Sequence, residues 1–172
     1  MTTRQRLRRS AFLCSHVLAN IASYRAGFDG ADLVRNEVFW RRANGNFMDI
    51  AVLEWCKLFA DNRGTYCWRN SLSDPAAFEV ALLVHLECTA DELATYCKGM
   101  RQYRDKFVAH LDEVLTGQYP QFDMAVDSTK FLFRYLWDNE DRGGYFVGLP
   151  DDPDRAYRVT LTDARRRYRI AT

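Results

Sequence analysis

The sequence has few of the residues that interrupt regular structure. Its 172 residues include only four prolines and nine glycines, and they contain no low-complexity tract and no repeat. Proline and glycine end helices and form the turns between short strands, so their scarcity favours long helices. At this length we expect one domain, spanning residues 1–172, with a core of its own.

An apolar run of 18 residues is also missing, so we expect no membrane-spanning helix and no membrane partner. Arginines 4, 6, 8 and 9 precede the stretch AFLCSHVLANIAS, an order that resembles a secretory signal peptide. However, His16 and Asn20 interrupt this stretch, and its apolar residues recur with the period of a helix. An amphipathic first helix explains the pattern better than export does, and we expect a cytoplasmic protein.

The cysteines form no CxxC pair, and their number is odd. They are Cys14, Cys56, Cys67, Cys88 and Cys97. Most lie within helix-like patterns, which is typical of reduced thiols in the core of a cytosolic protein. His85 and Cys88, with Cys97 nearby, are zinc-binding residue types, but no second ligand pair accompanies them. We expect no metal and no cofactor, and we expect His85 to be a hydrogen-bonded core residue.

Lysine is scarce, because 20 of the 24 basic residues are arginine. Residues 1–42 hold eight arginines against three acids, and residues 155–172 hold six against one. Two interpretations remain open. The charges either form solvated helix faces or contact phosphates where the two basic ends meet in the folded molecule. Arginine suits the second role, because its guanidinium binds phosphate through two parallel hydrogen bonds.

Apolar periodicity predicts an all-α fold, an antiparallel helical bundle of five to seven helices joined by short loops. The expected helices cover 4–25, 32–42, 47–60, 75–88, 89–117, 125–139 and a last segment that begins at 153. Asn44-Gly45-Asn46 is expected to separate the second helix from the third. Residues 61–75 are expected to form a loop anchored by Tyr66 and Trp68.

The longest predicted helix, Thr89 to Gly117, carries an apolar stripe that includes one charged residue, Arg104. The other members of the stripe are Leu93, Cys97, Met100, Phe107, Leu111 and Val114. A guanidinium on an inward face needs a partner. Glu54, in the largely apolar segment 47–60, is a candidate partner for Arg104. Lys57 lies three residues after Glu54, which is also an ion-pair spacing.

Arg104 and His110 are the candidate functional residues. On an ideal helix six residues give about 9 Å of rise and about 240° of turn, so these two side chains are not adjacent. Tyr103 and Lys106 are better aligned with His110. Such a set could hold a phosphodiester, because the cations stabilise developing charge and the histidine moves a proton. The alternative is that His110 bonds to a neighbouring helix while Arg104 pairs with Glu54 in the interior.

The segment RDKFVAH, Arg104 to His110, resembles the signature of the HEPN superfamily of α-helical bundles. That signature is an arginine followed by a polar residue, here Asp105, with a histidine after four to six intervening positions. The longer phrase MRQYRDKFVAHLD, together with EWCKLF and Trp68, is similar to the HEPN-like branch associated with bacterial abortive infection. Relatives often have histidine before this tryptophan, where the chain has Cys67.

The resemblance implies a bundle that dimerises, so that the Arg and His residues of two copies line one cleft. It also implies metal-independent RNA cleavage of the phage-defence or toxin type, in which the ribose 2′-hydroxyl attacks the adjacent phosphate. Arg104 would stabilise the phosphorane, His110 would act as general acid or base, and Asp105 would orient them. Tyr103 and Lys106 would bind substrate. Glu54 and Lys57 would orient the site.

RNA, a second copy of the chain and a cognate antitoxin protein are the partners that this resemblance implies. An alternative, from a different class, is a non-catalytic helical module that binds a protein or RNA without cleaving it. A third is a nucleotide-binding or nucleotide-transfer accessory, suggested only by analogy with the superfamily.

Overall fold

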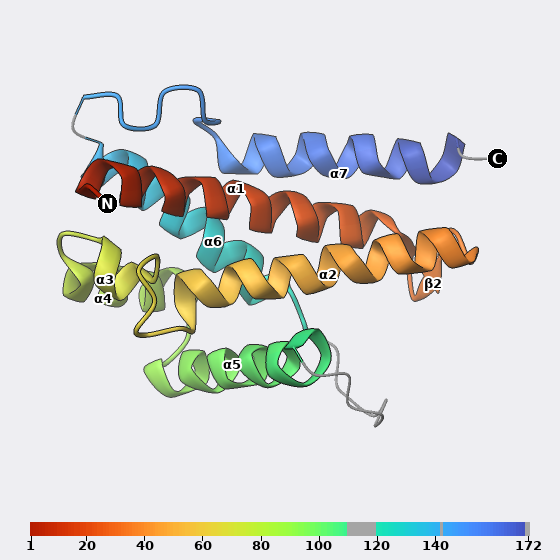
Figure 1. Ribbon diagram of the computed structural model, residues 1–172, viewed down its shortest axis with the longest axis horizontal. Helices are drawn as coiled ribbons and strands as arrows, with labels where there is room; N and C mark the ends of the chain where they lie inside the picture. The colour runs from red at the N-terminus through yellow and green to blue at the C-terminus, as the bar shows by residue number, and fades with distance from the viewer. Residues whose placement is uncertain (110–119, 142, 171–172) are drawn as a thin grey trace.

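The computed structural model of the protein describes residues 1–109, 120–141 and 143–170. This part of the chain forms seven α-helices, two π-helical segments and one two-stranded hairpin (Figure 1). In chain order they are α1 (Thr3–Ala26), β1 (Phe28–Asp29), β2 (Asp32–Leu33), α2 (Val38–Phe59), α3 (Trp68–Ser71), α4 (Pro75–His85), α5 (Ala90–Tyr103), η1 (Arg104–Ala109), α6 (Asp123–Tyr135), η2 (Leu136–Glu140) and α7 (Pro153–Ile170). The predicted all-α helical bundle is confirmed.

Helix α1 lies at the centre of the long helices, between α7 on one side and α2 on the other (Figure 1). The chain runs along α2 in the direction opposite to α1, whereas α7 runs parallel to α1. Helix α5 packs on the other side of α2, and α6 crosses behind the layer. The basic helices α1 and α7 therefore lie side by side, with the start of α1 and the end of α7 at opposite ends of the bundle.

Local capping signals place three helix starts as predicted. At the start of α5, the Thr89 side chain accepts from the backbone N–H of Glu92, whose carboxylate accepts in return from the Thr89 backbone. Asp74 caps α4 ahead of Pro75, and its carboxylate accepts from the N–H of Ala77 at 2.9 Å. Helix α7 begins at Pro153, after Asp152. These starts depend on bonds between near neighbours in the sequence.

The predicted break at residues 44–46 is wrong, because α2 continues from Val38 to Phe59 through Asn44-Gly45-Asn46. Asn44 is buried, and its side-chain oxygen accepts a hydrogen bond from the hydroxyl of Tyr168 at 3.0 Å. Since the side chain is held by another helix, it is not available to form a turn. Residues 32–37 are not helical, and 32–33 belong to the hairpin instead.

Smaller differences concern helix ends and loops. Helix α4 ends at His85 and not at 88, and the expected 61–75 loop contains the short helix α3. Helix α6 begins two residues early, at Asp123, and η2 extends it to Glu140. Element ends are the least constrained feature of a sequence pattern, because caps and tertiary contacts both move them.

The core is one cluster of aromatic and aliphatic side chains from all layers of the bundle. Its largest fully buried members are Trp55, Trp68, Phe78, Phe133 and Phe146. The indole N–H of Trp55 donates to the hydroxyl of Ser128 at 3.1 Å, so this buried donor is satisfied. Among the described residues, no helix is both long and apolar enough to cross a membrane.

The five cysteines are free thiols, as predicted. Four are buried, namely Cys14, Cys56, Cys67 and Cys97, and Cys88 is partly exposed. Burial raises the pKa of the Cys56 thiol to about 12 and that of Cys97 to about 11. These thiols are therefore protonated near neutral pH and behave as small apolar side chains.

Candidate functional site

The helical backbone changes type at the first residue of the motif. Helix α5 ends at Tyr103, and Arg104–Ala109 forms the π-helical segment η1. A π-helix has i to i+5 hydrogen bonds and is rare, and such segments occur frequently at functional sites. The predicted helix therefore does not continue as one α-helix. His110 and Gly117 lie outside the described residues, as do Leu111 and Val114 of the predicted stripe.

The guanidinium of Arg104 forms ion pairs with two carboxylates. Its Nη1 donates to Oδ1 of Asp61 at 2.6 Å, and its Nε donates to Oδ1 of Asp105 at 2.9 Å. The Arg104 side chain is 20% exposed, so it is neither sealed in the core nor fully solvated. Burial lowers the pKa of Arg104, but the bonds to Asp61 and Asp105 outweigh it and raise the pKa overall. The guanidinium is therefore firmly charged.

The partner Asp61 comes directly after the end of α2. Its backbone N–H donates to the carbonyl of Cys56 at 2.8 Å, and its own carbonyl accepts from Gly64 at 2.6 Å. Arg101, one turn before Arg104, donates from Nη1 to the carbonyl of Ala60 at 2.7 Å. The α5–η1 region thus places two guanidinium groups at the C-terminus of α2, where the helix dipole favours positive charge.

Tyr103 and Lys106 lie in different environments. Tyr103 is buried at 7% exposure, and its hydroxyl donates to Oδ1 of Asp49 on α2 at 2.8 Å. Lys106 is exposed. The phenol expected beside the ammonium therefore belongs to the packing between α5 and α2, because Asp49 offers it a partner there.

Glu54 pairs with neither of its two predicted partners. Its Oε1 lies 3.3 Å from Nδ1 of His16 on α1, and its Oε2 is buried with no hydrogen-bond partner among the described residues. Lys57 is exposed. The prediction of a Glu54–Lys57 or Glu54–Arg104 pair is therefore wrong. The carboxylate of Glu54 faces His16 on α1, and Arg104 pairs with Asp61.

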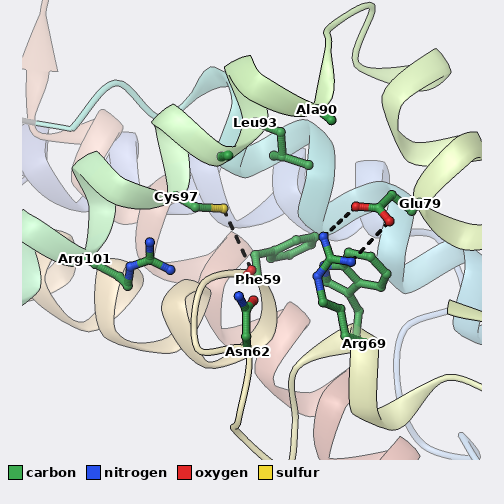
Figure 2. Close-up of a pocket in the computed structure, with 10 residues that line it drawn as sticks. Phe59, Asn62, Arg69, Glu79, Ala90, Leu93, Cys97 and Arg101 are labelled. Carbon is green, nitrogen blue, oxygen red and sulfur yellow. Dashed lines mark hydrogen bonds and ion pairs between the residues drawn. The ribbon is translucent and has the colours of Figure 1, made fainter. Parts of the chain in front are cut away.

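A pocket of about 110 Å³ lies one turn before the motif and is drawn in Figure 2. Arg101 lines it on the α5 side, together with Leu93 and Cys97, and Arg69 lines it from α3. Arg69 is held by a two-pronged ion pair with Glu79, at 3.1 and 2.5 Å, and its guanidinium lies 4.1 Å from the centre of the Trp68 ring. Trp68 and Arg69 thus build one wall of this pocket.

The described residues contain no group of three His, Cys, Asp or Glu side chains placed to hold a metal ion. His85 is exposed, and its ring stacks on Phe131 with the centroids 4.7 Å apart. The prediction of a core histidine is therefore wrong at this position, because α4 ends at His85 and turns it outward against α6.

Sequence reasoning missed Asp61, Asp49 and His16, which hold Arg104, Tyr103 and Glu54. Asp61 is 43 residues from Arg104 in the chain, and no periodicity connects the two. Its position directly after an apolar helix was the one available signal. No family model, curated protein or solved structure matches this chain.

Proposed function

We propose that this chain is a metal-independent endoribonuclease of the phage-defence or toxin type, which uses Arg104 and His110 in a cleft shared by two copies. The observation that supports it is the setting of Arg104. This guanidinium opens a π-helical segment that begins the motif, it is partly exposed, and Asp105, the polar residue of the motif, orients it at 2.9 Å.

The ion pairs leave Arg104 able to bind a phosphate. A guanidinium has five N–H donors. The hydrogen bonds to Asp61 and Asp105 use one N–H on Nη1 and the N–H on Nε. The remaining N–H groups can donate to a phosphodiester while the two carboxylates hold the plane of the guanidinium. Donors that are already fixed lower the activation barrier of cleavage, because they need not reorganise during the reaction.

The proposed reaction is an internal transfer. The ribose 2′-oxygen forms a bond to phosphorus as a base removes its proton, and the bond from phosphorus to the 5′-oxygen breaks as an acid protonates that oxygen. The products are a 2′,3′-cyclic phosphate and a free 5′-hydroxyl. His110 transfers protons in this scheme, and Arg104 stabilises the charge on the phosphorane.

The first test is incubation of the purified protein with structured RNA in EDTA. We expect cleavage with 2′,3′-cyclic phosphate ends, and we expect His110→Ala and Arg104→Ala each to lower the rate by about 100-fold or more. Lys98→Ala is the matched control, because Lys98 is an exposed cation on α5 outside the motif, and it should retain the wild-type rate. Circular dichroism must show folded variants.

Intact RNA at high protein concentration, or a His110→Ala protein that still cleaves, would contradict the proposal. The shared cleft is tested separately by light scattering. We expect the active species to have twice the chain mass, and an active monomer would contradict the dimeric arrangement.

A second candidate function is a helical module that binds RNA or a protein without cleaving it. The observation that favours it is the neutralisation of Arg104 by two carboxylates, together with the interior position of Tyr103. It predicts RNA binding or partner binding that survives His110→Ala unchanged, with no cyclic phosphate formed at any protein concentration.

A further inference from the structure

A second polar pocket, of about 250 Å³, lies where α1 begins and α3 ends. The residues that line it are Thr3, Arg6, Leu7, Ser71, Leu72, Ser73, Glu140 and Tyr145. Figure 1 shows the start of α1 and α3 at one end of the bundle, with η1 following the opposite end of α5. The pocket is therefore separate from the candidate ribonuclease site.

One wall of this pocket is a buried carboxylate that pairs with no cation among the described residues. Glu140, the last residue of η2, is 4% exposed. Its Oε1 accepts from both the backbone N–H and the hydroxyl of Ser73, each at 2.7 Å. Within the described part of the chain Glu140 forms no ion pair, and its hydrogen bonds there are the two from Ser73 to Oε1. A buried carboxylate in this state favours an additional N–H donor, above all a cationic one.

Arg6 and Ser71 line the same pocket from α1 and α3. Arg6 on α1 forms no ion pair with the described residues, and its buried Nε has no hydrogen-bond partner among them. Ser71 is only 2% exposed, and its hydroxyl also has no hydrogen-bond partner in the described part of the chain. Buried donors without acceptors are rare in folded proteins, and the cationic side chain of Arg6, which lines the pocket without an ion pair to any described residue, favours an anionic group there.

The remaining wall is held in place before any ligand arrives. Arg8 donates from Nη1 to the carbonyls of Tyr145 and Val147, both at 2.9 Å. The guanidinium of Arg4 lies 5.5 Å from the centre of the Tyr145 ring. These contacts fix the segment that follows η2 against α1, and a prearranged site binds with a smaller loss of conformational entropy.

We propose that this pocket binds a free α-amino acid with a small or medium apolar side chain. The ammonium group would donate to Oε2 of Glu140, and the carboxylate would accept from the guanidinium of Arg6. Leu7 and Leu72 offer apolar surface for the side chain. The two charged walls line one pocket without pairing with each other, so a zwitterion complements both at once, whereas a singly charged ligand leaves one of them unsatisfied.

The experiment titrates the full-length protein with L-leucine, by calorimetry and by thermal shift. Two analogues separate the contributions of the charges, because 4-methylpentanoate lacks the ammonium and isoamylamine lacks the carboxylate. We expect saturable binding of leucine with a rise in Tm, and at least about tenfold weaker binding of each analogue. Binding of either analogue as tight as that of leucine, or no saturable binding of leucine, overturns the proposal. The pocket would then hold ordered water only.

Variants test the two walls. Glu140→Gln retains an acceptor for Ser73 but loses the charge, and Arg6→Gln removes the guanidinium. Each should weaken leucine binding by about tenfold or more. Arg9→Gln is the matched control, because Arg9 is on α1 but does not line the pocket, and it should bind as wild type. Leucine binding that is unchanged in both folded wall variants would place the ligand elsewhere and overturn the proposal.

Discussion

Arg104 and Asp61 join the start of η1 to the turn after α2, with Nη1 and Oδ1 2.6 Å apart. Both side chains are mostly covered, at 20% and 32% exposure. We expect Asp61→Asn to lower the free energy of unfolding by about 1–2 kcal/mol, a value between those of exposed and buried pairs. Urea denaturation measures this change.

The same variant also tests the proposed function. Removing the charge of Asp61 leaves the Arg104 guanidinium less neutralised, so RNA affinity at low salt should rise. Asp105→Asn is the comparison for stability, since Asp105 is 60% exposed and its loss should change stability by less than about 1 kcal/mol. Weaker RNA binding by a folded Asp61→Asn protein would count against phosphate recognition by Arg104.

Two glycines should respond to alanine in opposite directions. Gly45 lies inside α2, and a Cβ there would meet nothing within 4 Å. Gly45→Ala should therefore stabilise the protein by about 0.5–1 kcal/mol, because alanine is the better helix former. Thermal unfolding measures the shift. A destabilised Gly45→Ala protein would show that α2 is broken at this position.

Gly27→Ala is the opposite case. A Cβ at Gly27 would lie 2.5 Å from Oδ1 of Asn44, the atom that accepts from the Tyr168 hydroxyl. Because Asn44 cannot move without losing this buried bond, we expect a loss of about 1–3 kcal/mol. Combining Gly27→Ala with Tyr168→Phe should cost less than the two separate losses added together, since both remove the same contact.

Tyr103→Phe separates packing from chemistry. The lost hydrogen bond to Asp49, 2.8 Å long, should lower the free energy of unfolding by about 1–2 kcal/mol. The rate of any RNA cleavage should stay at the wild-type value at a temperature where both proteins are folded. Tyr66→Phe is the control, because the Tyr66 hydroxyl makes a long 3.9 Å contact to the sulfur of Met1, and the substitution should change neither quantity. A large loss of cleavage activity in a folded Tyr103→Phe protein would show that the Tyr103 hydroxyl takes part in the reaction.

Thiol reactivity should follow exposure and pKa. Cys88 is partly exposed, whereas the other four thiols are buried. Burial raises the pKa of Cys97 to about 11, so its reactive thiolate is scarce at pH 8 and increases as the pH rises. Titration of the native protein with a thiol reagent at pH 8 should modify Cys88 first. Mass spectrometry that found Cys14 or Cys56 modified before Cys88 would contradict this order.

The sequence predicted what depends on near neighbours in the chain. The starts of α4 and α5 follow from Asp74 and from the Thr89–Glu92 box, since the caps bond to backbone groups only three residues away. The all-α class follows from apolar periodicity, which any helix must show in order to bury one face.

The tertiary structure decided what depends on residues far apart. Asn44 remains helical because its side-chain oxygen accepts a hydrogen bond from the hydroxyl of Tyr168, which lies 124 residues later in the chain. Arg104 pairs with Asp61 and not with Glu54, and the pocket at Glu140 brings α1 together with the end of α3. Spacing rules apply within one element, whereas the partner of a buried charge is set by which elements pack together. For this reason the sequence could indicate that Arg104 needs a partner but could not identify it.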